Sequence, residues 1–119
     1  MKGDPEGFLR EREALNQSVL RNADQVIKRV YAADALAYKA GALPVQVKEL
    51  LGLATSLVLR CDDCISWHIH RCFEESVSTP EVMAALGIGT VVGGTITIPH
   101  LRRAAALWEK LTLSRDGGQ

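Results

Sequence analysis

The sequence has no surplus of charge of either sign, because 14 Lys and Arg residues balance 14 Asp and Glu residues among its 119 residues. This balance excludes the basic footprint of a nucleic-acid-binding domain, and no acidic tail is present. A chain with so little net charge gains little solubility from charge. Covering part of the surface by self-association is therefore favoured.

Long apolar runs are also missing. The two longest uncharged and largely apolar stretches, 50–59 and 86–99, are shorter than the roughly 18–20 residues that a membrane-spanning helix needs. The N-terminal stretch MKGDPEGFLRERE is charged and lacks the apolar segment of a signal peptide. We therefore expect a soluble, cytoplasmic protein with no membrane partner and no nucleic-acid partner.

Helical periodicity runs through most of the chain, which is short enough for one domain. It predicts two helices within 8–40 with a turn near 22–24, and further helices at 45–60, 62–76, from Thr79-Pro80-Glu81 onward, and at 99–113. Apolar residues go almost all the way round 45–60, which predicts deep burial. Only GIGTVVGGTITI, 87–98, has the β-branched residues and glycine pair of a β-hairpin, but no other segment offers a partner strand.

All three cysteines lie between 61 and 72, beside two of the three histidines. On one helix, Cys61, Cys64, His68 and Cys72 form a stripe about 80° wide. Cys72 lies about 12 Å along the axis from Cys64, which exceeds the roughly 7 Å between α-carbons that a disulfide allows. Cys61 and Cys64 are thus the two that can pair. In a reducing compartment, such clusters are more often metal ligands or redox thiols than structural disulfides.

A Cys-x-x-Cys motif at a helix start has a chemical use, because the helix dipole stabilises a thiolate there and the second thiol can resolve what the first one forms. His68, one turn after Cys64, is placed to relay a proton. Glu49 is the candidate base, because a carboxylate in an apolar helix is costly unless it has a partner.

Other interpretations remain open for the same residues. The cysteines could be packed core residues, or zinc ligands together with His68 and a fourth residue, although a second Cys-x-x-Cys is missing. Glu49 could form a surface salt bridge. His70 and Cys72 fit packed or solvated positions, and His100, after Pro99, fits a structural role at a helix start.

The pattern Glu49-x11-Cys61-x2-Cys64-x3-His68 resembles the alkyl hydroperoxidase D-like branch of the carboxymuconolactone decarboxylase family. The stretch VKELLGLATSLVLRCDDCISWHIHRC is similar to the core helix pair of that family, and VVGGTITIPHLRRAAALWEKL to its glycine-rich helix. The resemblance implies a single all-α domain of about six helices in the chain, with the family-like part at 32–113 and with 87–98 helical. An N-terminal helical segment, 1–31, would precede it and a flexible tail, 114–119, would follow. It also implies a homo-trimer or homo-hexamer.

For activity, the resemblance implies a thiol-dependent peroxidase or disulfide reductase without a metal or organic cofactor. Cys64 would attack a hydroperoxide, Cys61 would resolve the product, and Glu49 with His68 would move the proton. A dithiol reductant, such as a lipoylated adaptor or a thioredoxin-like protein, would reduce the disulfide. The sequence departs from the best-known peroxidase of the family at Asp63, where that enzyme has histidine, and an acid there opposes a thiolate.

Two alternative functions follow from the same residues. One is a lactone decarboxylase that uses His68 or His100 as acid or base, although the cysteine pair fits that chemistry less well. The other is a non-enzymatic zinc-binding or thiol-sensor module.

Overall fold

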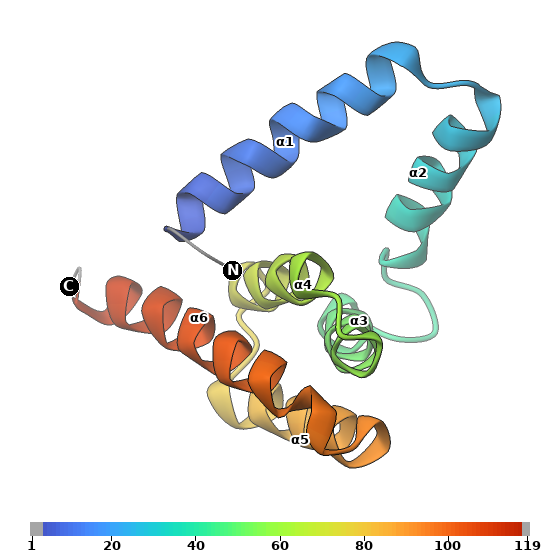
Figure 1. The fold of residues 1–119 in the computed structure, drawn as a ribbon. Helices are drawn as coiled ribbons and strands as arrows, with labels where there is room; N and C mark the ends of the chain where they lie inside the picture. Colours follow the sequence, from blue (N-terminus) through green and yellow to red (C-terminus); the bar gives the residue numbers. More distant parts are fainter. Residues whose placement is uncertain (1–3, 118–119) are drawn as a thin grey trace.

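The computed structural model describes residues 4–117, which form an all-helical chain without a strand (Figure 1). The elements in order are α1 (Pro5–Asn22), α2 (Gln25–Ala37), α3 (Val45–Leu59), α4 (Asp62–Glu74), α5 (Thr79–Gly93), a 3-10 turn η1 (Thr95–Thr97) and α6 (Ile98–Gly117). The expected all-α class with about six helices is confirmed. The division at Asn22–Asp24 is also where the sequence pattern predicts it.

The hairpin propensity of 87–98 is overridden, and the segment is helical as far as Gly93. The reason is close packing of α5 on α3. A side chain at Gly89 would place its Cβ 3.0 Å from the backbone oxygen of Ala54. The turn after α5 uses Gly94 at φ 84°, a conformation that glycine adopts without strain. Tertiary contacts therefore decide this segment against its local β preference.

Helix caps explain where the helices begin. Ser78 is the N-cap of α5, which starts at Thr79 as predicted, and it forms a capping box with Glu81. Asp4 caps α1 and Pro5 occupies its first turn, so the helix begins three residues before the predicted position 8. Residues 114–117, expected in a flexible tail, continue α6. The remaining terminal residues, 1–3 and 118–119, lie outside the part of the chain that is described.

The core lies between α3, α4, α5 and α6, which pack around one apolar cluster (Figure 1). The buried apolar side chains are Leu53, Leu57, Ile65, Ile69, Cys72, Val77, Val82, Leu86, Ala104 and Trp108. The indole N–H of Trp108 donates to Thr79 Oγ1 at 2.9 Å, so the polar edge of this residue is also satisfied. The same cluster fixes α4 against α3, and these two helices carry the candidate site.

One face of α3 is exposed in this single chain, so the predicted burial on all sides is wrong here. Gly52, Leu53 and Leu57 face the core, whereas Leu51 is 52% and Leu59 is 77% exposed. The helix therefore carries apolar side chains on two sides, and α4 and α5 cover only one of them.

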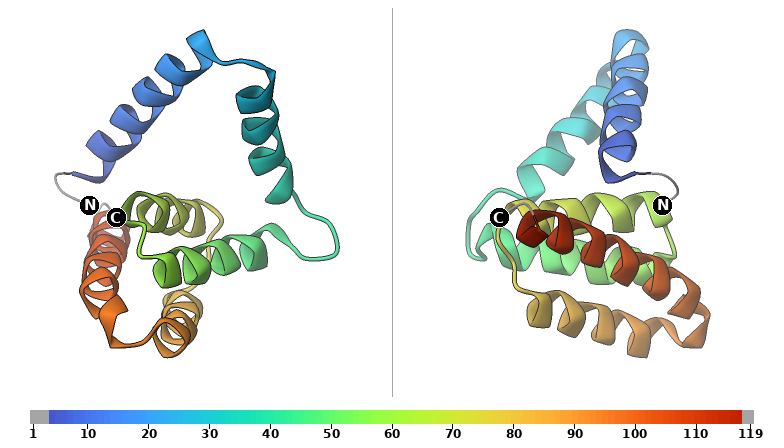
Figure 2. Two further views of the ribbon diagram at one scale, coloured as in Figure 1. Left: turned by 45° about the vertical axis from the view of Figure 1, so that its right-hand side comes forward. Right: turned by 90° about the vertical axis from the view of Figure 1, so that its left-hand side faces the viewer.

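Helices α1 and α2 project from the core and lean together at their far ends (Figure 2). Neither contains a buried residue. The N-terminal half of α1 contacts α4 through one aromatic stack and one cation–π contact. Phe8 stacks on His70 with ring centroids 5.7 Å apart, and the Arg12 guanidinium lies 3.5 Å above the Trp67 ring. These contacts place α1 beside the helix that carries the cysteine pair.

Candidate active site

The cysteine pair lies at the first turn of α4 and forms the Cys61–Cys64 disulfide. Arg60 ends α3 in the left-handed conformation, with φ 58°. This sharp turn brings Cys61 to the N-cap of α4, where its sulfur accepts the Cys64 backbone N–H at 3.2 Å. Free N–H groups and the helix dipole at this position stabilise a thiolate. The predicted pairing is confirmed.

Cys72 is buried and free, as the helical spacing requires. Desolvation raises the pKa of its thiol to about 12, and the negative charge of Glu49 adds to this shift. A thiol that stays protonated at neutral pH is a poor nucleophile. Cys72 is therefore a core residue. Between residues 4 and 117, no group of three or more His, Cys, Asp or Glu side chains could hold a metal ion.

Glu49 and His68 are brought together from α3 and α4, as the family resemblance implies. Glu49 is 1% exposed, and its Oε1 lies 2.8 Å from His68 Nδ1. A carboxylate at Nδ1 selects the tautomer with the proton on that nitrogen and leaves Nε2 as the exchangeable position. The surface salt bridge considered for Glu49 is excluded by this burial.

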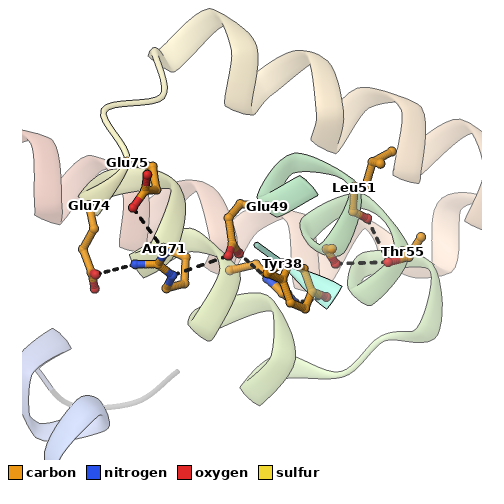
Figure 3. A network of polar contacts seen from close by, with 9 residues as sticks. Tyr38, Glu49, Leu51, Thr55, Arg71, Glu74 and Glu75 are labelled. Atoms are coloured by element: carbon orange, nitrogen blue, oxygen red, sulfur yellow. Dashed lines mark hydrogen bonds and ion pairs between the residues drawn. The ribbon is translucent and has the colours of Figure 1, made fainter. Parts of the chain in front are cut away.

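Arg71, one turn after His68, is a second cationic partner of the buried carboxylate. Its Nε lies 3.4 Å from Glu49 Oε2, and its other nitrogens reach Glu74 at 2.7 Å and Glu75 at 3.2 Å (Figure 3). These contacts hold the guanidinium in place and compensate the charge of Glu49, which burial alone would disfavour. Sequence analysis missed Arg71, although its spacing of three from His68 places both on one helix face.

Tyr38, at the C-terminal cap of α2, closes the other side of His68. Its hydroxyl oxygen lies 3.3 Å from His68 Nε2, and the two rings are 5.1 Å apart. Burial raises the Tyr38 pKa, and the charges of Asp34 and Glu49 add to this shift. The phenol therefore stays protonated and can donate to Nε2. No sequence pattern pointed to Tyr38, because it lies 30 residues from His68.

Gly52 gives the imidazole the room it occupies. A Cβ at this position would lie 2.5 Å from His68 Cε1 and 2.8 Å from each ring nitrogen. The glycine of α3 therefore packs directly on the ring that Glu49 and Tyr38 hold.

A cavity of about 510 Å3 opens between α1, α2 and the start of α4. Cys64 and His68, one helical turn apart, both line it. The other lining residues are Phe8, Glu11, Arg12, Leu15, Asn16, Val19, Tyr31, Asp34, Asp63 and Trp67. The cavity thus joins the second cysteine and the histidine in one space. Asp63 lies in the same space, with two further carboxylates.

The remaining histidines have contacts that the sequence did not indicate. His100, at the start of α6, places Nδ1 2.6 Å from Asp62 Oδ1, and Arg103 reaches the other carboxylate oxygen at 3.1 Å. His70 is buried against Phe8. Burial lowers the pKa of His70, and the nearby Glu74 opposes the shift.

Comparisons with known proteins identify the fold and the family. Residues 25–107 match the family model described as the carboxymuconolactone decarboxylase family. A crystal structure of the Thermotoga maritima protein TM1620 superposes with a TM-score of 0.92 at 45% identity, covering 94% of this chain and 98% of the other. A second crystal structure of TM1620 gives 0.87 at 44% identity, covering 95% and 97%. Its description assigns TM1620 to the same family and suggests an involvement in antioxidative response.

More distant relatives extend the comparison. A carboxymuconolactone decarboxylase family protein of Legionella pneumophila shares the fold with a TM-score of 0.82 at 19% identity, covering 90% of this chain and 96% of the other. A curated, uncharacterized protein of Cupriavidus necator is 28% identical over 71 residues, which are 60% of this chain and 63% of that relative's length. The family model covers more than half of the chain. This chain therefore belongs to the carboxymuconolactone decarboxylase family.

Proposed function

We propose that the protein is a thiol-dependent hydroperoxide reductase of the alkyl hydroperoxidase D-like type. The carrying observation is the Cys61–Cys64 pair at the start of α4, one turn from a histidine that a buried glutamate holds. Cys64 and that histidine share one cavity. The antioxidative involvement suggested for TM1620 supports the same chemistry.

The proposed reaction has three steps: reduction of the peroxide, formation of the disulfide, and reduction of the disulfide. The Cys64 thiolate attacks the distal peroxide oxygen, the O–O bond breaks, and the departing alkoxide takes a proton from His68, giving an alcohol and a sulfenic acid. The Cys61 thiol then attacks the Cys64 sulfur, releasing water and forming the disulfide. Finally, a dithiol reductant exchanges with the disulfide and becomes oxidised itself. A lipoylated adaptor or a thioredoxin-like protein provides such a dithiol. The same exchange can run in the other direction. The reduced Cys61 and Cys64 thiols would then reduce the disulfide of another molecule, which is a disulfide reductase activity.

The path of the proton follows from the hydrogen bonds around His68. Glu49 accepts from Nδ1 and stabilises the doubly protonated ring, while Nε2 faces the Tyr38 hydroxyl. Arg71 places a positive charge beside the buried Glu49 carboxylate, 3.4 Å from its Oε2. The Glu49–His68 pair can thus store the proton released when Cys64 ionises and return it to the alkoxide.

The proposal includes self-association as a homo-trimer or homo-hexamer. Apolar side chains that no helix of this chain covers support it. They lie mainly on α2 and α5 and include Val26, Val30, Leu36, Met83, Ile88, Val91, Val92 and Ile96. Sedimentation equilibrium measures the assembly directly, and a monomer at micromolar concentration would contradict this part of the proposal.

The test of the activity counts free thiols per chain after one equivalent of hydroperoxide. Reduced wild-type protein should fall from three thiols to one, with a Cys61–Cys64 disulfide found by peptide mapping. Cys64→Ser should lose none of its two thiols to an intramolecular disulfide. Cys72→Ala is the matched control and should form the disulfide as the wild type does. If the reduced wild type keeps all three thiols, the redox proposal is wrong, and lactone decarboxylation and zinc content are the next assays.

A further inference from the structure

A polar cluster on the far side of the cysteine turn has no part in the relay described above. Asp62, the first residue of α4, directly follows Cys61. Its carboxylate lies 2.6 Å from His100 Nδ1 and 3.1 Å from Arg103 Nη2. Both partners belong to α6, and they are 38 and 41 residues away in the chain.

The cluster connects the cysteine turn to the core. The turn is held within α4 by the Cys64 N–H bond to the Cys61 sulfur, and before α4 it follows a left-handed residue. Asp62 adds two contacts to a separate helix and so ties the residue next to Cys61 to α6. The contact residues are only partly covered, with 32% of the Asp62 side chain, 19% of His100 and 44% of Arg103 exposed.

The electrostatic role of the cluster concerns two adjacent carboxylates. Asp62 and Asp63 lie between the cysteines, and each ionised carboxylate disfavours a thiolate nearby. Burial raises the Asp62 pKa, but the hydrogen bond from His100 and the charge of Arg103 outweigh this effect and leave the pKa below its ordinary value. Asp62 is therefore ionised at neutral pH, and Arg103 compensates its charge. Asp63 is exposed and has no such partner among the contacts described.

We propose that Arg103, which compensates the Asp62 charge, and His100, which orients the carboxylate, are positioning residues that act through Asp62 on the thiolate stability and the reduction potential of the Cys61–Cys64 pair. The inference rests on the proposed redox role of this pair, but on no particular oxidant. A more stable thiolate stabilises the reduced form and makes the disulfide more oxidising. Removing the Asp62 charge should therefore raise the potential, and removing the Arg103 charge should lower it.

Other charges near the cysteines stay the same in every variant used below. Asp63 belongs to the same turn, Arg60 precedes Cys61, and Glu11 and Asp34 face the cavity that Cys64 lines. Glu49 and His68 belong to the proposed proton relay and are also unchanged in these variants. A comparison among Asp62 and Arg103 variants therefore isolates one charge pair.

The experiment measures two quantities for Asp62→Asn and Arg103→Gln. The first is the pKa of the reactive thiol, from the pH dependence of alkylation of the reduced protein. The second is the reduction potential at pH 9, from equilibration with reduced and oxidised dithiothreitol. We expect Asp62→Asn to increase the ionisation constant of the thiol by about threefold and Arg103→Gln to decrease it by a similar factor. A threefold change corresponds to about 15 mV for a two-electron couple.

Three control variants separate charge from shape. Arg102→Gln changes an exposed neighbour of Arg103 on α6 and should shift neither quantity. Arg103→Lys keeps the charge but not the forked geometry, and should stay near the wild type. The double variant Asp62→Asn/Arg103→Gln should return toward the wild type, because the two single effects oppose one another.

Opposite shifts for the two single variants support the proposal. Shifts in the same direction would assign the cluster a purely structural role, and no shift in either would remove any link to the cysteines. Both results overturn the inference. Thiol pKa and potential need no peroxide, so a wild type that fails to react with hydroperoxide would refute the proposed activity while this test still stands.

Discussion

The glycine beneath the candidate histidine allows a sharp test of the site geometry. Gly52 and Gly87 are both interior residues of helices, α3 and α5 respectively. Replacing an interior helical glycine by alanine removes backbone freedom from the unfolded chain and should stabilise by roughly 0.5–1 kcal/mol, if the methyl group has room. At Gly87 nothing lies within 4 Å of the added Cβ. Gly87→Ala should therefore gain this full amount.

At Gly52 the same methyl group collides with the imidazole of His68. The added Cβ would lie 2.5–2.8 Å from three ring atoms, which is inside van der Waals contact, and overpacking of this kind costs about 1–3 kcal/mol. The ring cannot move without stretching the 2.8 Å contact to Glu49 or the 3.3 Å contact to Tyr38. Net of the glycine gain, we expect Gly52→Ala to lose up to about 2.5 kcal/mol relative to the wild type, and to be about 1–3 kcal/mol less stable than Gly87→Ala. It should also slow disulfide formation by hydroperoxide at least tenfold.

Two measurements test this prediction. Urea unfolding of the reduced variants gives the stability difference, and stopped-flow loss of thiols gives the rate. Gly87→Ala is matched in residue type and helical location, so it reports the propensity gain alone. Equal stabilisation by both substitutions, with the wild-type rate in Gly52→Ala, would refute the claim that α3 packs directly on a functional His68.

Three further predictions follow from the burial of single groups. Because the Cys72 pKa is raised to about 12 by burial, folded reduced protein should react at two thiols with iodoacetamide at pH 8, and at three only after unfolding; three fast thiols in the folded state would contradict the burial. His70 has a pKa lowered by burial, so the unfolded chain binds a proton below about pH 6.5 that the folded chain refuses until its lower pKa is reached. The free energy of unfolding should therefore decrease as the pH is lowered below about 6.5. His70→Leu should reduce this decrease, and an unchanged profile in that variant would mean that another group causes it. Glu49→Gln should lower the free energy of unfolding by about 2 kcal/mol, because Arg71 and His68 lose a charged partner; urea unfolding checks this, and an unchanged stability would show that the pair is not buried as described.

The helices and the pairing of Cys61 with Cys64 could be predicted from the sequence because their signals are local. The spacing of Cys61, Cys64 and His68 lies within one helix, and helical geometry alone converts that spacing into one face. The same geometry excluded a disulfide to Cys72, and the structure agrees. The position of Glu49 opposite His68 required a second helix. It was implied by family resemblance, not by any local rule.

The partners of the site residues could not be predicted in this way. Tyr38 reaches His68 across 30 residues and His100 reaches Asp62 across 38. Such contacts depend on how whole helices pack, which periodicity does not specify. The segment 87–98 shows that a local propensity can also predict the wrong structure. Its β-branched residues favour a strand locally, but the small residues of α5 let it pack closely on α3, and that contact decides the outcome.

The two acids between the cysteines show why the site needs its tertiary partners for interpretation. In the sequence, Asp62 and Asp63 are equivalent first-turn acids, each favoured by the helix dipole. In the fold, Asp62 turns toward α6 and is compensated by Arg103, whereas Asp63 lines the cavity beside Cys64. The position that departs from the best-known peroxidase is thus also the one that keeps its uncompensated charge next to the proposed nucleophile. In the proposed reaction, stabilisation of the Cys64 thiolate would therefore come from the helix N-terminus and from the His68–Glu49 pair, whereas Asp63 would oppose it.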